Sequence, residues 1–181
     1  SGITQSRYPT RVKQIIPPFS LWWIGMVHDY AMWRDDPEFV ADRMPGVRAV
    51  LEAFRRWVNS DGLVEAPPGW NYVDWVPGWK DGMHPDADHG ISSVINWITV
   101  YALGLAAELE DMAHEPELAL RNRKLADRIA AATASAFWDE SRGVFSDNLS
   151  RTSYSEHAQC MAILSGRCDK SKQDRAAQGL M

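Results

Sequence analysis

The residues with the clearest chemical potential stand in one short aromatic segment near the middle of the chain. This segment holds Asp74 together with Trp70, Tyr72, Trp75 and Trp79. A carboxylate beside indole rings suits a sugar pocket, because the rings stack on apolar sugar faces while the carboxylate accepts hydrogen bonds from hydroxyls. The alternative is a packed Ω-loop in which Asp74 caps local backbone amides. The residue types leave both interpretations open.

Two histidine-containing segments follow the aromatic segment. Residues 84–89 hold two histidines and two aspartates, which are residue types that bind metals. They lack the spacing of a calcium-binding loop and of a helical histidine pair, so a solvated acidic loop leading into a helix cap fits better, and we predict no metal site. The second segment is residues 154–157. Its His157 either donates a hydrogen bond to a ligand hydroxyl or has its hydrogen bonds satisfied within the first turn of a helix.

A pair of acids, Asp139 and Glu140, lies beside Trp138 and ahead of Gly143. Acidic residues between a helix end and a glycine usually bond the backbone of a turn. We therefore expect turn formation rather than catalysis from these two acids.

Hydrophobic periodicity predicts an all-α fold that positions these groups. Apolar residues recur at three- and four-residue spacings, which predicts helices over 19–34, 36–59, 92–113, 116–137, 155–164 and 169–180, with a short strand at 144–146. The first helix is apolar around most of its circumference and should be deeply buried. Pro45-Gly46 should divide the second helix in two. Short turns between long helices indicate antiparallel hairpins.

Residues 62–90 form the least periodic stretch, rich in proline and glycine. A long loop inside a compact domain is usually functional or disordered, and the aromatic residues in this one argue against disorder. The chain holds nine tryptophans, and for each of them core filling remains as good an explanation as sugar stacking.

Composition excludes several classes of protein. Hydrophobic residues make up 45% of the chain and the formal net charge is −5, so the chain is an ordinary globular protein without the basic face that nucleic acid or anionic membrane requires. No apolar run reaches the ~18 residues of a membrane span. No signal peptide is visible, and the missing initiator Met suggests processing or a piece of a longer protein. Cys160 and Cys168 are expected to be free thiols. Motifs for nucleotide binding, zinc proteolysis and α/β-hydrolase chemistry are absent from the sequence.

The order of these clusters resembles the catalytic domain of the α-L-rhamnosidases, glycoside hydrolase family 78. The resemblance runs along nearly the whole chain and is carried by Tyr8-Pro9, Ile16-Pro17-Pro18-Phe19-Ser20-Leu21-Trp22-Trp23, Asp61-Gly62-Leu63, Trp70-Asn71-Tyr72-Val73-Asp74-Trp75, Phe137-Trp138-Asp139-Glu140 with Arg142-Gly143, and Ser155-Glu156-His157-Ala158. It implies that residues 1–181 are part of an (α/α)6 barrel of six helical hairpins, with a few short strands in its loops and a sugar pocket at one end.

The resemblance also implies an inverting hydrolysis of terminal α-L-rhamnosides, which uses one carboxylic acid and one carboxylate that activates water. The family's acid motif precedes the Tyr8-Pro9 region and its base lies beyond residues 155–158. Neither motif is found here, so we expect the catalytic acid and base to lie outside this chain and the isolated chain to be inactive. No cofactor is expected, and a bacterial cytoplasm or periplasm would suit such an enzyme.

By the same resemblance, several residues are expected to contact substrate. They are Asp74, Trp75, Trp70, Trp79, Trp22, Trp23 and His157. Exposed apolar helix faces of a partial barrel predict self-association. Two alternatives remain: a non-catalytic helical domain that binds carbohydrate or scaffolds a partner, and a six-hairpin glycosidase for another sugar.

Overall fold

The computed structural model describes residues 2–180 and is mostly helical. Along these residues run α1 (Pro17–Trp33), α2 (Pro37–Arg55), α3 (Ser93–Met112), α4 (Pro116–Phe137), α5 (Glu156–Leu164) and α6 (Lys170–Gln178). Strands β1 (Trp138–Asp139) and β2 (Val144–Phe145) pair antiparallel, with Trp138 opposite Phe145. The predicted all-α class, the four long helices and the short strand near residue 144 are confirmed.

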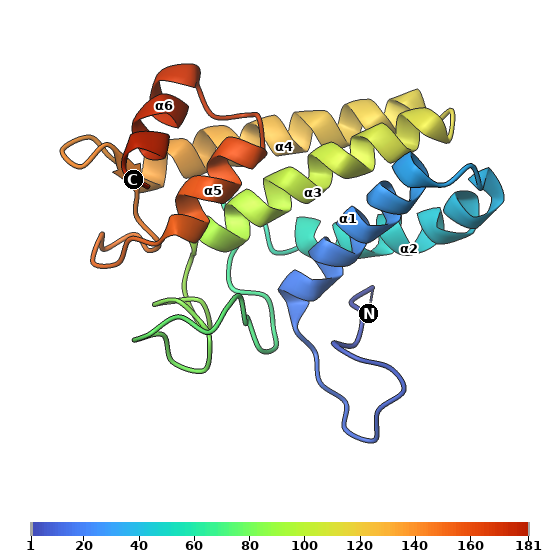
Figure 1. The fold of residues 1–181 in the computed structure, drawn as a ribbon, viewed down its shortest axis with the longest axis horizontal. Coiled ribbons are helices and arrows are strands. Elements are labelled where there is room, and N and C mark those ends of the chain that lie inside the picture. The colour runs from blue at the N-terminus through green and yellow to red at the C-terminus, as the bar shows by residue number, and fades with distance from the viewer. Residues whose placement is uncertain (1, 181) are drawn as a thin grey trace.

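Consecutive helices pack in pairs, α1 on α2, α3 on α4 and α5 on α6. Helices α1, α3 and α5 begin on the same side of the molecule, where the long connections gather (Figure 1). Helix α3 is central, because it packs against α1, α4 and α5, and its side chains are buried along most of its length. This arrangement places the loops before α1, α3 and α5 at one end of the helical layer.

Helix α1 is less buried than its composition predicts. One side packs on α2 and α3 through Leu21, Ile24 and Val27. On another face, Met26 is 68% exposed and Trp33 is 86% exposed. The prediction of deep burial is therefore wrong for this face, which no other described segment covers.

Helix α2 runs without interruption through Pro45, so the predicted break at Pro45-Gly46 is wrong. Pro45 is exposed, and the buried residues Met44 and Val47 hold both halves of the helix against the core. Gly46 serves packing instead, because a Cβ atom there would lie 2.8 Å from Cη2 of Trp23.

A partly buried ion pair ties α2 to α3. The Nε and Nη2 atoms of Arg48 donate to the two oxygens of the Glu110 carboxylate, at 3.0 and 2.7 Å, and the Glu110 side chain is fully buried. Bidentate geometry of this kind fixes the relative position of the two helices.

Both cysteines are free, as predicted. Among residues 2–180, none of the helices is long and apolar enough to cross a membrane.

The contact between Gly46 and Trp23 makes a stability prediction. Gly→Ala in a helix ordinarily stabilises by about 1 kcal/mol. We expect that gain for Gly104→Ala on α3, where a new Cβ meets no atom within 4 Å. Gly46→Ala should not show this stabilisation, because the new methyl group would displace the Trp23 ring from its packed position. Urea unfolding of both variants measures the difference, and equal stabilisation by the two would contradict the packing role of Gly46.

Candidate functional site

The loop between α2 and α3 is anchored at both ends. Isolated bridges join Val58 to Val64 and Glu65 to Ile91, and a third joins Ser92 to Asn148 of the later connection. Within the loop, the buried Asn71 side chain donates to the carbonyls of Pro67 and Ala87 at 2.8 and 2.9 Å. These bonds give the irregular segment a defined backbone, so the side chains it carries are held in place.

Three aromatic rings form the aromatic cluster, defined here as Trp70, Tyr72 and Trp75. Their ring centroids lie 5.1 Å apart for Trp70 and Tyr72, 5.2 Å for Tyr72 and Trp75, and 6.2 Å for Trp70 and Trp75. The indole N–H of Trp70 donates to the carbonyl of Asp81 at 2.8 Å. Gly82 sits under Tyr72, where any Cβ atom would overlap the ring. The three rings therefore pack against one another as one cluster.

Asp74 and Trp75 face solvent rather than the core. The Trp75 side chain is 69% exposed, and that of Asp74 is 56% exposed. One carboxylate oxygen of Asp74 accepts from the backbone N–H of Trp75 at 2.7 Å, which is the local capping that the alternative interpretation foresaw. The other oxygen lies 3.3 Å from Nε2 of His157 on α5. Asp74 therefore both orders its own turn and links the loop to another helix.

His157 also contacts a second indole. The ring centroid of His157 lies 5.2 Å from that of Trp79. Trp79 also contacts a second histidine, His84, with the two ring centroids 5.4 Å apart. His84 is buried, and its Nε2 pairs with the hydroxyl of Ser92, the residue that caps α3. Burial lowers the pKa of His84, because loss of water disfavours the charged ring.

The prediction of a solvated loop over residues 84–89 is therefore only partly right. His84 is buried under Trp79, while Asp88 and His89 are exposed and bond each other. Across residues 2–180, no three His, Cys, Asp or Glu side chains are grouped closely enough to hold a metal ion.

A cavity of about 610 Å³ opens beside Trp79. Its walls are residues 76–79 and Pro85 from the α2–α3 connection and residues 152–157 at the start of α5. His157 lines this cavity, and its hydrogen bond to Asp74 connects the cavity wall to the turn that carries Trp75.

Asp147 is a positioning residue that the sequence analysis missed. This buried carboxylate accepts from the Ser153 hydroxyl at 2.7 Å and from the Ser155 hydroxyl and backbone N–H at 2.6 and 3.1 Å. It thereby fixes the first turn of α5 and the direction of His157. The only local signal was the serine-rich segment that follows it.

The predicted tryptophans do not all meet at one place. Trp70 and Trp75 lie in the aromatic cluster, and Trp79 lies at the cavity. Trp22 pairs instead with Tyr101 of α3 at 6.3 Å. Trp23 packs on Gly46 between α1 and α2, which is a structural role.

The acids at the β-hairpin form a turn, as predicted. Asp139 accepts from the backbone N–H groups of Ser141 and Arg142 and from the Tyr154 hydroxyl. The hydroxyls of Ser141 and Tyr154 contribute most to lowering the pKa of Asp139 to about 2. Glu140 accepts from the Trp138 indole and pairs with Arg175. Both carboxylates are thus engaged in holding the hairpin.

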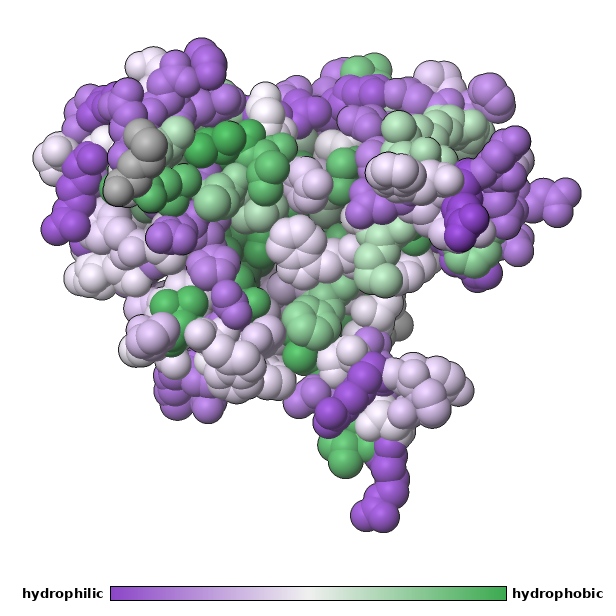
Figure 2. Space-filling view, viewed as in Figure 1, coloured by the Kyte–Doolittle hydropathy of each residue, from purple (hydrophilic) through white to green (hydrophobic). Residues whose placement is uncertain are grey.

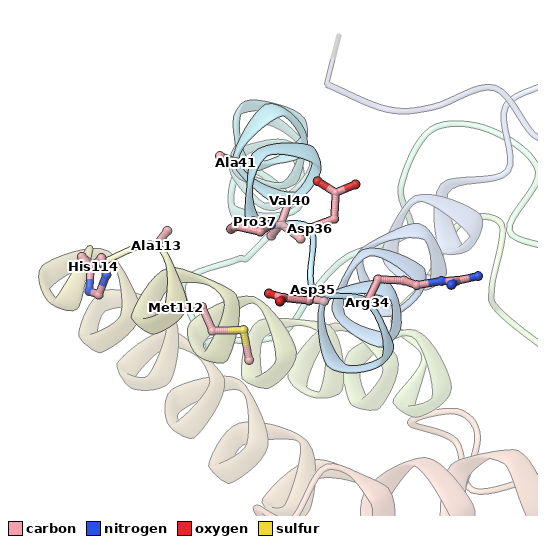
Figure 3. A pocket seen from close by; sticks show the side chains of 10 residues that line it. Arg34, Asp35, Asp36, Pro37, Val40, Ala41, Met112, Ala113 and His114 are labelled. Atoms are coloured by element: carbon pink, nitrogen blue, oxygen red, sulfur yellow. The ribbon is translucent and has the colours of Figure 1, made fainter.

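A second cavity, of about 340 Å³, lies at the opposite ends of α1 and α3. Figure 3 shows that the Arg34 and Asp36 side chains there point in different directions. Asp36 caps α2 by accepting from Phe39 N–H at 3.0 Å, and it also accepts from the Tyr30 hydroxyl. None of the predicted substrate-contacting residues lines this cavity.

The fold and the site together define a helical-hairpin domain that presents aromatic rings and a carboxylate at the loop end. The model for the bacterial α-L-rhamnosidase six-hairpin glycosidase domain matches residues 12–181. The chain therefore belongs to this family, which confirms the resemblance inferred from its motifs.

Solved structures agree with this assignment. A family 78 rhamnosidase of Bacillus sp. GL1 superposes with a TM-score of 0.87 at 25% identity, covering 99% of this chain and 19% of that one. A rhamnosidase from Klebsiella oxytoca with rhamnose bound gives a TM-score of 0.81 at 18% identity, covering 99% of this chain and 34% of that one. No curated protein sequence matches significantly. The chain thus spans about a fifth and a third of the length of these two proteins.

The burial of His84 makes a pH prediction. The unfolded chain binds a proton at this residue more readily than the folded chain, so the free energy of unfolding falls as the pH drops below the ordinary imidazole pKa of about 6.5. His84→Gln should weaken that dependence, whereas His89→Gln, at an exposed position, should keep the wild-type slope. Thermal midpoints measured between about pH 8 and pH 5 test this, and identical slopes for wild type and His84→Gln would refute it.

Proposed function

We propose that these 181 residues form part of a single glycosidase domain that hydrolyses terminal α-L-rhamnosides by direct attack of water. The catalytic acid and base come from segments outside this chain, so the chain supplies substrate contacts rather than the reacting carboxylates. Membership of the rhamnosidase family supports a glycoside hydrolase, and the Klebsiella oxytoca neighbour was solved with rhamnose bound.

One observation carries the assignment of the pocket wall. Asp74 and Trp75 are adjacent, exposed and located where the connections before α1, α3 and α5 gather. The exposed indole of Trp75 offers an apolar face for a deoxy sugar, with Trp70 beside it. The Asp74 carboxylate accepts hydrogen bonds from sugar hydroxyls, and His157 holds it in place. In an inverting reaction the two catalytic carboxyl groups stand about 6.5–9.5 Å apart to admit water, so the ring must be fixed by groups such as these.

Removing the Asp74 carboxylate tests the assignment. Hydrogen bonds to charged groups contribute about 1.5–3 kcal/mol, so Asp74→Ala should lower kcat/KM by roughly 10- to 150-fold. The assay is turnover of nitrophenyl α-L-rhamnoside by the polypeptide that carries this chain together with its catalytic carboxylates. Asp88→Ala, an exposed aspartate of the same loop, is the matched control and should leave turnover unchanged.

Wild-type kinetics in Asp74→Ala at unchanged thermal stability would remove Asp74 from the pocket. A panel of other nitrophenyl glycosides distinguishes a rhamnosidase from a six-hairpin enzyme for another sugar. A lack of turnover on every member of the panel, with saccharide binding retained, would favour the non-catalytic alternative.

We also propose that the isolated chain self-associates through the exposed face of α1. Trp22, Met26 and Trp33 fall on one side of this helix at four- and seven-residue spacings, and they are 38%, 68% and 86% exposed. Figure 2 shows neutral and hydrophobic side chains gathered across the centre of this side of the molecule, with hydrophilic ones around the rim. Contiguous exposed apolar surface of this kind promotes association.

Size-exclusion chromatography of the 181-residue chain measures this association. The wild-type chain should elute as a dimer or larger species, and the double variant Met26→Ser, Trp33→Ser should shift toward the monomer. Leu164→Ser removes an exposed apolar side chain from α5 and serves as the control. A wild-type chain that elutes as a stable monomer would refute the proposal.

A further inference from the structure

The cavity at the opposite ends of α1 and α3 has no part in the proposed function. Its volume of about 340 Å³ lies at the lower end of the range of roughly 300–1,000 Å³ of small-molecule sites. Its walls come from the last turns of α1 and α3 and from the first turns of α2. This size suits a ligand of a few carbon atoms.

Most of the lining is apolar. The apolar walls are Ala31 on α1, Val40 and Ala41 on α2, and Met112 and Ala113 at the end of α3. Val40 is buried, whereas Met112 is 46% exposed, and the unbranched methionine side chain adapts to the shape of a ligand. Such walls favour a hydrocarbon body, because its transfer from water is the driving force.

One carboxylate of the lining is free to bind a ligand. Among the described residues, the Asp35 side chain has no hydrogen-bond or ion-pair partner. The neighbouring Asp36 is engaged, because it accepts from the Phe39 N–H and from the Tyr30 hydroxyl. A carboxylate only accepts hydrogen bonds, so the ligand must donate them.

The charged side chains of the rim leave the cavity to Asp35. Figure 3 shows the Asp35 carboxylate pointing toward the side on which Met112 lies, while the Arg34 side chain extends away from that side. His114 is exposed and lies beyond Ala113 at the outer edge (Figure 3). The negative charge of Asp35 is therefore the one that faces the apolar walls.

The helix ends at the cavity add to this negative charge. Helices α1 and α3 both end there, and the C-terminal end of a helix carries partial negative charge. Helix α2 begins there, but its positive end offers few free donors. Pro37 has no N–H, and the N–H groups of Phe39 and Val40 both bond Asp36. The cavity therefore favours a cation over an anion.

We infer that this cavity binds a small organic cation, with its alkyl body between α1, α2 and α3 and its ammonium or guanidinium group on Asp35. A free alkylamine has this chemistry, and so has a lysine or arginine side chain of another polypeptide segment, whose hydrocarbon stem ends in a cation. The site is separate from the wall formed by Asp74 and Trp75, so the inference goes beyond the proposed function and does not rest on it.

Saturation-transfer NMR titration of the chain with pentylamine and with 1-pentanol tests the inference, because the alcohol has the same alkyl chain without the charge. Dissociation constants in the millimolar range are expected of ligands this small. The wild-type chain should bind the amine about three- to tenfold more tightly, the effect of one charged hydrogen bond at an exposed carboxylate. Asp35→Asn should abolish this preference. Asp42→Asn, an exposed aspartate of α2 outside the lining, is the matched control and should keep it.

A second variant tests the location. Ala41→Leu fills the cavity from an exposed helical position and should weaken binding of both ligands. Equal affinities of the wild-type chain for amine and alcohol, or a preference retained in Asp35→Asn, would overturn the cation site. Unchanged affinities in Ala41→Leu would overturn its assignment to this cavity. Asp74→Ala should bind pentylamine as the wild type does, so a failed sugar assignment leaves this test intact.

A third ligand, Nα-acetyl-lysine methylamide, distinguishes the two sources of the cation. Binding of this compound more tightly than pentylamine supports the site and identifies a polypeptide side chain as its occupant. Weaker or equal binding supports the site with a free amine as its occupant.

Discussion

The first turn of α3, with the buried polar residues Ser93 and Asn96, constrains the positions of both long connections at the loop end of the molecule. Asn96 is fully buried, and its side chain both donates to and accepts from the backbone of Val64, at 3.0 and 2.8 Å. Ser93 binds the later connection, with its hydroxyl on the Ser146 carbonyl at 2.6 Å and its N–H on the Asp147 carbonyl at 3.0 Å. A buried polar group left without a partner costs about 1–3 kcal/mol, so both connections must return to this turn in one arrangement.

Helix α5 is tied to the same frame by a side-chain amide. Gln159 pairs with both backbone groups of Phe145, each at 2.7 Å, as a neighbouring strand would. Asp147 then orders the turn that leads into α5. With the starts of α3 and α5 fixed in this way, a hydrogen bond such as that between His157 and Asp74 forms across 83 residues of sequence without a large ordering cost.

Local rules were sufficient for most elements but not for the contacts between them. Periodicity located the long helices, and the capping role of Ser92 at α3 follows from residue type. The continuity of α2 through Pro45 was not predictable locally, because it depends on burial of the flanking side chains. The exposed face of α1 was equally hidden, since an apolar sequence does not say how many neighbours a helix has.

At the site, the residue types around Asp74 indicated a sugar-binding wall, which remains a proposal. Its link to His157 and the burial of His84 arise from tertiary contacts that no short pattern encodes.

Exposure alone does not show whether an apolar side chain is held ready for a ligand, as a comparison of Trp33 with Trp75 illustrates. Trp33 is 86% exposed at the end of α1, and no aromatic ring or hydrogen bond of the described residues fixes its side chain. Trp75 is 69% exposed, yet its ring is held by Tyr72 and Trp70, and its backbone N–H is bound by the Asp74 carboxylate. Ordering a free side chain on binding costs about 0.5–1.5 kcal/mol. At Trp75 the side chain is already ordered by folding, so a ligand on its indole face would not have to meet this ordering cost. At Trp33 any partner must first order the ring.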